Sequence, residues 1–308
     1  MTYTIMVAVD GRPEHRAALD WAATRAARDA ARLELVYVIE RSWGDSPDRP
    51  GRALELAART LLEAERTIAL RRMADFARRV TVPPSSASDA ALPGGEQEVT
   101  AGFRYGHVGR ELVRASAGAD LLVIGTPSEL DRQHAFSGSL AVRVAAAAEC
   151  AVAVVPHGWE PRGRGVVVGV DGEPPAEAAV AFAADEAAAL DEPLTVVCAG
   201  YVANPLLAGL VPEISLGDRR RQIVDAAREY ALELDRGITV FAEVVETSPA
   251  PGIVAEADGS RMLVIGTRDR HGVQRVMLGS VGHDVLLNVR VPVVVVRTRN
   301  EALTRLHP

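Results

Sequence analysis

The sequence predicts an α/β protein made of two tandem domains, each a doubly wound parallel sheet with helices on both faces. Two observations carry this prediction. Short apolar runs rich in Val and Ile alternate with longer segments of helical periodicity, a pattern typical of parallel strands buried on both sides. An ordered set of motifs then occurs a second time along the chain, which indicates that the unit is repeated.

The elements of the first half follow one another in strand–helix order. Helical periodicity predicts four helices, and Pro13 fits the first turn of the first of them, where its missing N–H costs nothing. These helices are expected at residues 13–31, 52–79, 107–117 and 139–148. The apolar runs predict strands at residues 4–9, 33–39, 98–102, 120–124 and 151–155. Right-handed crossovers between such strands give a doubly wound sandwich.

The second half repeats this series. Its strands are expected at residues 165–170, 194–199, 239–244, 261–265 and 292–296. Residues 218–221 read as the start of a helix with surface charges.

The repeat also fixes the domain organisation. The segment Val-Asp-Gly recurs at an offset of 161, whereas Leu-Val-Ile-Gly-Thr, Gly-Ser and the last Val-rich strand all recur at an offset of 141. The first half is therefore longer by the difference between these two offsets, and the added length is expected in two turn-rich stretches, 42–52 and 83–96. We expect domains at residues 1–157 and 158–308, joined by a linker (157–164) rich in Gly, Pro and charge.

Composition excludes several classes of function. The formal net charge is -7 without a basic block, which argues against broad binding to nucleic acids or anionic membranes. The chain has no lysine, so a P-loop lysine or a Schiff-base lysine is excluded. The two cysteines, Cys150 and Cys198, have no metal or redox spacing and read as small core residues.

The expected location is the cytoplasm. The first ten residues lack the layout of a signal peptide. No apolar run is long enough to span a bilayer.

Small and polar residues gather where the predicted strands end. Asp-Gly follows the first strand of each half, and a glycine follows the fourth strand, with a loop and a Gly-Ser pair after it. Glycine lets backbone N–H groups approach a phosphate closely, and a helix N-terminus favours an anion. Each serine alone reads as a helix cap and each aspartate as a turn residue. Their joint placement at strand ends in both halves favours a ligand site.

These motifs resemble the universal stress protein family. That family carries Gly, two residues, Gly, nine residues and then Gly-Ser or Gly-Thr at this place, and it opens with a strand ending in Asp-Gly. The similar stretches here are VDGRPEHRAALDWAATRAA, GHVGRELVRASAGADLLVIGT and RHGVQRVMLGSVGHDVLLNVRVPVVVVR. The resemblance covers nearly the whole chain, twice, outside the added stretches. It implies a Rossmann-like fold of the adenine nucleotide alpha hydrolase-like kind in each half.

The resemblance also implies a ligand, because members of the family bind ATP at these positions. Asp10 would then be the candidate ligand for a Mg²⁺ ion that accompanies the nucleotide. The nucleotide-binding residues that the resemblance implies are Asp10, Gly11, Val38, Gly125, Ser128, Gly138, Ser139, Leu140, Asp171, Gly172, Ala199, Gly266, Asp269, Gly279, Ser280 and Val281.

The sequence departs from the family at the second glycine of the loop. Ser128 stands there in the first half and adds only a small side chain. Asp269 stands there in the second half and places a carboxylate beside a polyphosphate, which repels it unless a metal ion or a nearby arginine offsets the charge. The loop therefore favours the first half as the nucleotide site.

Three functions remain open. The first is a stress-response regulator or sensor that binds ATP or another adenine nucleotide. The second is an interaction module that binds no nucleotide, which the loss of the second glycine in both halves supports. The third is a slow ATPase. The sequence shows no Ser-His-Asp set, acid–base pair or metal motif, so catalysis is not the expected role.

The fifth strands predict how the halves associate. Both are apolar, and both would be sheet edges if the strand order is 3-2-1-4-5. The family resemblance implies antiparallel pairing of these strands. We therefore expect the two halves to pair within one chain as a pseudo-dimer, and a homodimer of chains is a further expectation.

Overall fold

The computed structural model describes residues 2–40, 52–80, 98–126, 138–173, 175–200, 213–234, 236–267, 278–288 and 290–297. The loop residues Ser128 and Asp269 lie outside these ranges. So do most of the two turn-rich stretches of the first half and residues 268–277 of the second.

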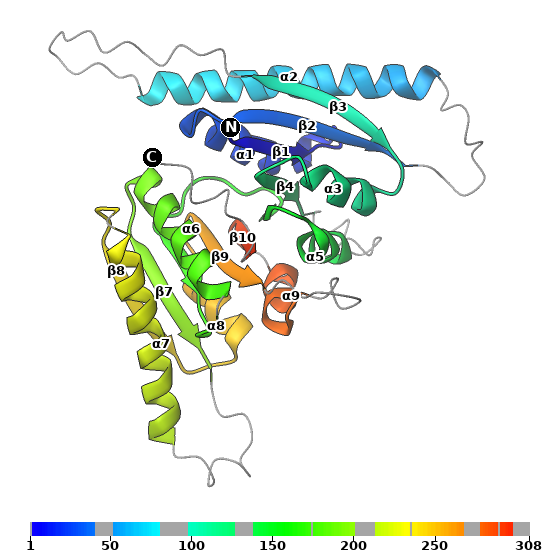
Figure 1. The fold of residues 1–308 in the computed structure, drawn as a ribbon. Helices are drawn as coiled ribbons and strands as arrows, with labels where there is room; N and C mark the ends of the chain where they lie inside the picture. Colours follow the sequence, from blue (N-terminus) through cyan, green and yellow to red (C-terminus); the bar gives the residue numbers. More distant parts are fainter. Residues whose placement is uncertain are drawn as a thin grey trace, which may run out of the picture.

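Each half is an alternating series of strands and helices (Figure 1). The first half consists of β1 (Thr4–Ala8), the 3₁₀ turn η1 (Pro13–His15), α1 (Ala17–Arg28), β2 (Arg32–Ile39), α2 (Arg52–Val80), β3 (Val99–Tyr105), α3 (Val108–Ser116), β4 (Leu121–Gly125), α5 (Gly138–Ala147) and β5 (Ala151–Val155). The second half consists of β6 (Val166–Gly169), α6 (Pro175–Leu190), β7 (Leu194–Ala199), α7 (Glu213–Glu233), β8 (Val240–Val245), α8 (Pro249–Glu256), β9 (Met262–Thr267), α9 (Ser280–Leu287) and β10 (Val293–Arg297).

The ten strands of the described residues form one sheet in the order β3-β2-β1-β4-β5-β10-β9-β6-β7-β8. Within each half the pairs are parallel and follow the expected order 3-2-1-4-5. The halves join through antiparallel pairing of β5 with β10. The predicted fold class and the intramolecular pseudo-dimer are therefore confirmed.

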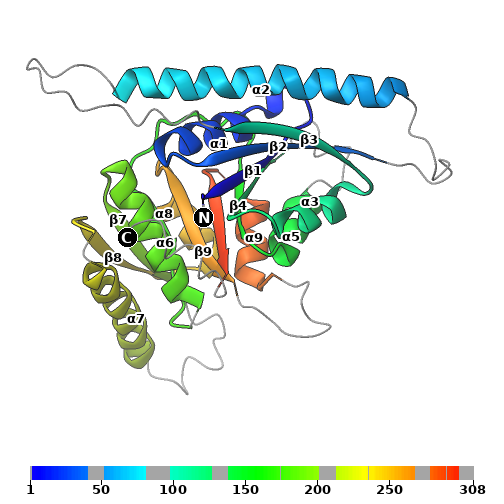
Figure 2. The same ribbon diagram turned by 45° about the horizontal axis from the view of Figure 1, so that its top comes forward.

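Helices cover both faces of the sheet (Figure 2). One core packs α1, α2, α6 and α7 against the strands, and it contains large buried side chains such as Leu19 and Leu33. The other packs α3, α5, α8 and α9, with buried residues such as Leu112 and Val285. Apolar positions on both sides of each strand explain why the sequence shows continuous apolar runs.

Two expectations about helices are corrected. The helix expected at residues 13–31 is split into η1 and α1, because the chain makes a 3₁₀ turn after Pro13 before α1 begins at Ala17. Helix α7 begins at Glu213, so residues 218–221 lie inside it and not at its start.

Two equivalent contacts show which residues of α2 and α7 correspond in the repeat. The Nε of Arg66 donates to the carbonyl oxygen of Val99, and the Nε of Arg228 donates to that of Val240. The sequence separation is 33 in the first contact and 12 in the second. The separation in the first half is thus larger by 21 residues (33 minus 12). The first half is longer than the second by 20 residues (161 minus 141), so the two values agree to within one residue. The added length therefore lies between Arg66 and Val99, in one stretch and not in two.

Candidate functional site

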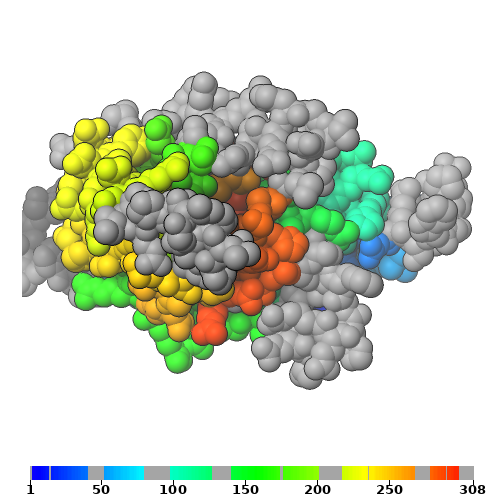
Figure 3. All heavy atoms as spheres, turned by 90° about the horizontal axis from the view of Figure 1, so that it is seen from below, coloured from blue at the N-terminus to red at the C-terminus, as the bar shows by residue number. Residues whose placement is uncertain are grey.

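The carboxyl ends of the second half's strands surround a cavity of about 510 Å³. Helices α7 and α8 and the first turn of α9 complete its wall. Figure 3 looks onto the end of the molecule toward which β7 runs in Figure 1, with α9 in orange-red. The lining residues include the predicted Asp171, Ala199, Gly266, Gly279, Ser280 and Val281.

The first turn of α9 faces this cavity. Gly279 is the N-cap residue, and no side chain caps the helix within the described part of the chain. A Cβ added at Gly279 would have no atom of the described residues within 4 Å, so the backbone is approachable from the cavity in this part of the structure. The unpaired N–H groups of such a turn form a ready site for an anion.

Two arginines that the sequence pattern assigned to a charged surface also line the cavity. Arg219 and Arg220 project from α7. The Nε of Arg220 is buried without a hydrogen-bond partner among the described residues. Because an unpaired buried donor costs free energy, a ligand that accepts a hydrogen bond or carries negative charge would relieve this cost.

Two charged groups of the same cavity affect the pKa of the Cys198 thiol. Burial at the end of β7 raises the pKa of its thiol, the charge of Arg220 opposes this rise, and the charge of Asp171 adds to it. Both charged groups therefore act on one point in the wall. The Asp171 carboxylate itself accepts a hydrogen bond from the backbone N–H of Glu173 (3.0 Å), which closes the turn after β6.

The equivalent aspartate of the first half has different partners. The Oδ1 of Asp10 accepts from the backbone N–H of Arg12 (3.0 Å), and its Oδ2 lies 2.5 Å from the Nδ1 of His15. The His15 ring meets the ring of His157 edge-on, with centroids 6.0 Å apart. A cation at Asp10 would have to compete with His15 and Arg12 for this carboxylate.

The remaining predicted residues of the first half are spread over several elements. Gly11 lines a separate, open cavity of about 650 Å³ against α2, and Val38 is half-buried in β2. Gly125 ends β4, and Gly138, Ser139 and Leu140 lie in the first turn of α5.

The structure gives Gly11 and Gly172 a common role in their turns. Both have a positive φ, +77° and +78°. A Cβ at Gly11 would lie 2.5 Å from Leu61 of α2, and one at Gly172 would lie 2.9 Å from Ile223 of α7. Gly172 thus shapes the turn beside the cavity without lining it.

Sequence reasoning missed Arg219, Arg220, His15 and His157. One signal for the arginines was available, because Leu61-Leu62-Glu63-Ala64 resembles Ile223-Val224-Asp225-Ala226 and both segments precede the equivalent Arg66 and Arg228 by two residues. This register places Ala57 and Ala58 of the first half where the second half has Arg219 and Arg220. The histidines have no such signal, because Ala176 stands where the repeat would place a partner of His15.

The described residues contain no group of three or more His, Cys, Asp or Glu side chains that could hold a metal ion. No described helix is long and apolar enough to cross a membrane.

Comparisons with known proteins cover nearly the whole chain. It is 27% identical to a universal stress protein of Mycobacterium tuberculosis, over 95% of this chain and 96% of that protein. It is 28% identical to a universal stress protein of Mycolicibacterium smegmatis, over 96% of this chain and 98% of that one. A universal stress protein structure from Archaeoglobus fulgidus has the same fold, with a TM-score of 0.60, 14% identity and 96% of each chain covered.

The sequence model described as the Universal stress protein family matches residues 1–156 and 164–297, which are the two halves of the sheet. The chain therefore belongs to the universal stress protein family.

Proposed function

We propose that the protein is a stress-response regulator whose second half binds an adenine nucleotide such as ATP. The observation that carries the proposal is the cavity at the carboxyl ends of β6, β7 and β9. Its volume of about 510 Å³ falls within the roughly 300–1,000 Å³ typical of small-molecule sites. Its position is the one at which parallel α/β sheets bind ligands.

The wall of the cavity fits the chemistry of a nucleotide. The apolar side chains of Ile223, Ile253 and Ile265 suit a base, and the first turn of α9 suits a phosphate. Arg219 and Arg220 supply positive charge without a lysine. Asp171 would orient a ribose hydroxyl or share a Mg²⁺ ion with the phosphates.

The choice of the second half differs from what the loop residues predicted. Neither Ser128 nor Asp269 lies in the described part of the chain, so their contribution stays a prediction. Support for the second half comes from the arginine pair, which offsets the charge that a carboxylate in the loop would bring. Nucleotide binding would regulate the protein by favouring whichever state of the chain binds it more tightly.

Titration calorimetry with ATP, with and without Mg²⁺, tests the proposal. We expect about one equivalent bound per chain, and we expect Gly279→Glu to abolish binding because the new side chain would enter the cavity at a position with open space. The matched control is Gly138→Glu, the equivalent position of the first half, which should leave binding intact.

Two results would overturn the proposal. No binding at millimolar ATP would favour the interaction module without a nucleotide. Binding that survives Gly279→Glu and is lost in Gly138→Glu would move the site to the first half.

A further inference from the structure

The pairing of β5 with β10 relates the two halves by a local two-fold axis. Ala153 pairs with Val294, and these two residues are equivalent in the repeat, at the offset of 141. On either side, Val152 pairs with Val295 and Val154 with Val293, so the register is symmetric about the central pair. On one face of the sheet α5 and α9 are in contact across the same axis.

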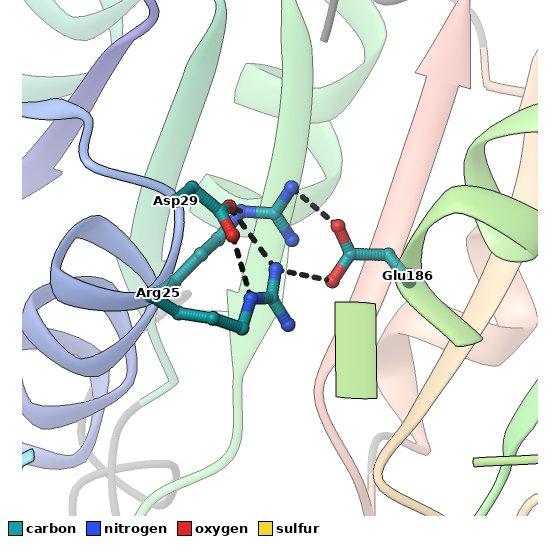
Figure 4. Close-up of polar contacts among 4 residues, drawn as sticks. Arg25, Asp29 and Glu186 are labelled. Atoms are coloured by element: carbon teal, nitrogen blue, oxygen red, sulfur yellow. Dashed lines mark hydrogen bonds and ion pairs between the residues drawn. The ribbon is translucent and has the colours of Figure 1, made fainter. Parts of the chain in front are cut away.

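On the other face, equivalent residues of α1 and α6 meet across the axis. Arg25 and Glu186 are related by the offset of 161, which also relates the Val-Asp-Gly segments that precede these two helices. The Nη2 of Arg25 lies 2.5 Å from the Oε1 of Glu186 (Figure 4). The rings of Trp21 and Phe182, which are also equivalent, lie 5.6 and 5.3 Å from the Cζ of Arg25.

This contact is buried, and neighbouring charges complete it. The side chains of Arg25 and Glu186 are each 3% exposed. Arg28 lies 3.0 Å from Glu186, and Asp29 lies 3.3 Å from Arg25, so the cluster holds two positive and two negative groups. Burial lowers the pKa of Arg25, but Glu186, Tyr3 and Asp29 raise it, and the net effect is a rise. The Arg25 guanidinium is therefore charged throughout the physiological range.

A symmetric interface brings each residue near its own copy. If the first half paired in this way with the first half of another chain, two Arg25 guanidinium groups would be buried together. If the second half did so, two Glu186 carboxylates would be buried together. Both arrangements would leave buried charge uncompensated, because Asp29 would offset only part of the arginine charge in the first and Glu186 would lose both arginines in the second. The unlike halves instead bring opposite charges together.

We propose that Arg25 and Glu186 make the β5–β10 interface selective for unlike halves, so that its partner is the chain's own other half and not the same half of a second copy. The two halves share the apolar strand edge and the aromatic residues, which would accept either partner. The charge at the axis is what distinguishes them. This inference does not depend on nucleotide binding.

A charge-reversal cycle on the full chain gives the first test. Arg25→Glu and Glu186→Arg should each raise the unfolding equilibrium constant in urea by roughly 100-fold or more, the scale expected when a buried pair is broken. The double reversal should recover only part of this loss, because the reversed pair attracts again while Asp29 and Arg28 each face a like charge. A double variant as unstable as either single variant would overturn the proposal.

The control for this cycle is an exposed pair. Arg162 lies 2.5 Å from Glu160, but their side chains are 84% and 59% exposed. Arg162→Glu should change the unfolding constant by less than about threefold. An effect as large as that of Arg25→Glu would show that any charge reversal destabilises this protein.

Exchange between chains tests selectivity itself. A protease site inserted after Gly158, which is exposed and has open space around it, allows the folded chain to be cut in the linker. The cut Arg25→Glu and cut Glu186→Arg proteins are then unfolded and refolded together. We expect the first half of the Arg25→Glu protein to pair with the second half of the Glu186→Arg protein, and the two wild-type halves to pair with each other, because opposite charges then meet at the axis. Native mass spectrometry with one protein isotope-labelled would identify these hybrids. Random assortment of the halves would overturn the proposal.

Discussion

The two halves share a fold but not the chemistry at their strand ends. In the second half, Asp171, Arg219 and Arg220 line a cavity of about 510 Å³. In the first half, Asp10 is bound to His15 and Arg12, and the positions of the two arginines are alanines. The comparison teaches that duplication kept the turns that build the site and changed the side chains that would hold a ligand.

The largest expected effect is a loss of stability at the two glycine turns that the halves share. Gly11→Ala and Gly172→Ala should each lower the free energy of unfolding by about 2–4 kcal/mol, because both residues have a positive φ and both approach the neighbouring helix. Urea denaturation of the two variants would measure this. Gly217→Ala, in a helix with open space, should stabilise the protein by up to about 1 kcal/mol. A large difference between the first two variants would mean that the turns are not equivalent.

The next effect is a loss of ATP affinity at an arginine that only the second half has. Arg220→Ala should weaken ATP binding roughly tenfold, because the guanidinium would lose a charge-assisted hydrogen bond to the ligand. Arg221→Ala is the matched control, since Arg221 is exposed and does not line the cavity. Calorimetry would compare the two variants with the wild type. Equal affinities for all three proteins would show that Arg220 does not contact the nucleotide.

The smallest expected effect is a difference in maleimide reactivity between the two cysteines. Burial raises the pKa of Cys150 to about 12, and its thiol donates to the carbonyl of Ala151 in the core. Cys198 lines the cavity and has Arg220 nearby. A maleimide should therefore modify Cys198 several-fold faster than Cys150, and bound nucleotide should slow only Cys198.

The pH dependence of this reaction has a definite sign. Because the thiolate reacts, the rate at Cys150 should keep rising between pH 9 and 11, where a thiol of ordinary pKa is already ionised. Peptide mapping by mass spectrometry would assign the rates. Faster modification of Cys150 than of Cys198 at neutral pH would contradict the assignment of the cavity.

The sequence predicted the sheet well because strand signals are local. Strands β5 and β7 have the expected bounds, and the apolar runs that predicted the edge strands also predicted their pairing. The cavity was predicted only in part. Asp171 follows β6, Gly266 lies in the last residues of β9 and Gly279 caps α9, and the ends of such elements are visible in a sequence.

Arg219 and Arg25 show why the rest could not be predicted. Arg219 belongs to residues 218–221, which read as surface charges, and nothing in the pattern around Arg25 predicts a buried partner. The positions of both arginines depend on residues far away in the chain. Arg25 is buried because Glu186 meets it from the other half of the chain. A pattern read within one helix contains no information about such a partner.

The Arg25–Glu186 contact also orders events in the history of the chain. A free-standing subunit that pairs with its own copy carries the same residue on both sides of the axis, so neither charge could be buried there without meeting itself. The opposite charges could arise only after the subunit had been duplicated, so that its two copies could mutate separately. Once both charges were in place, a return to subunits that pair with themselves would require reversing one of them first.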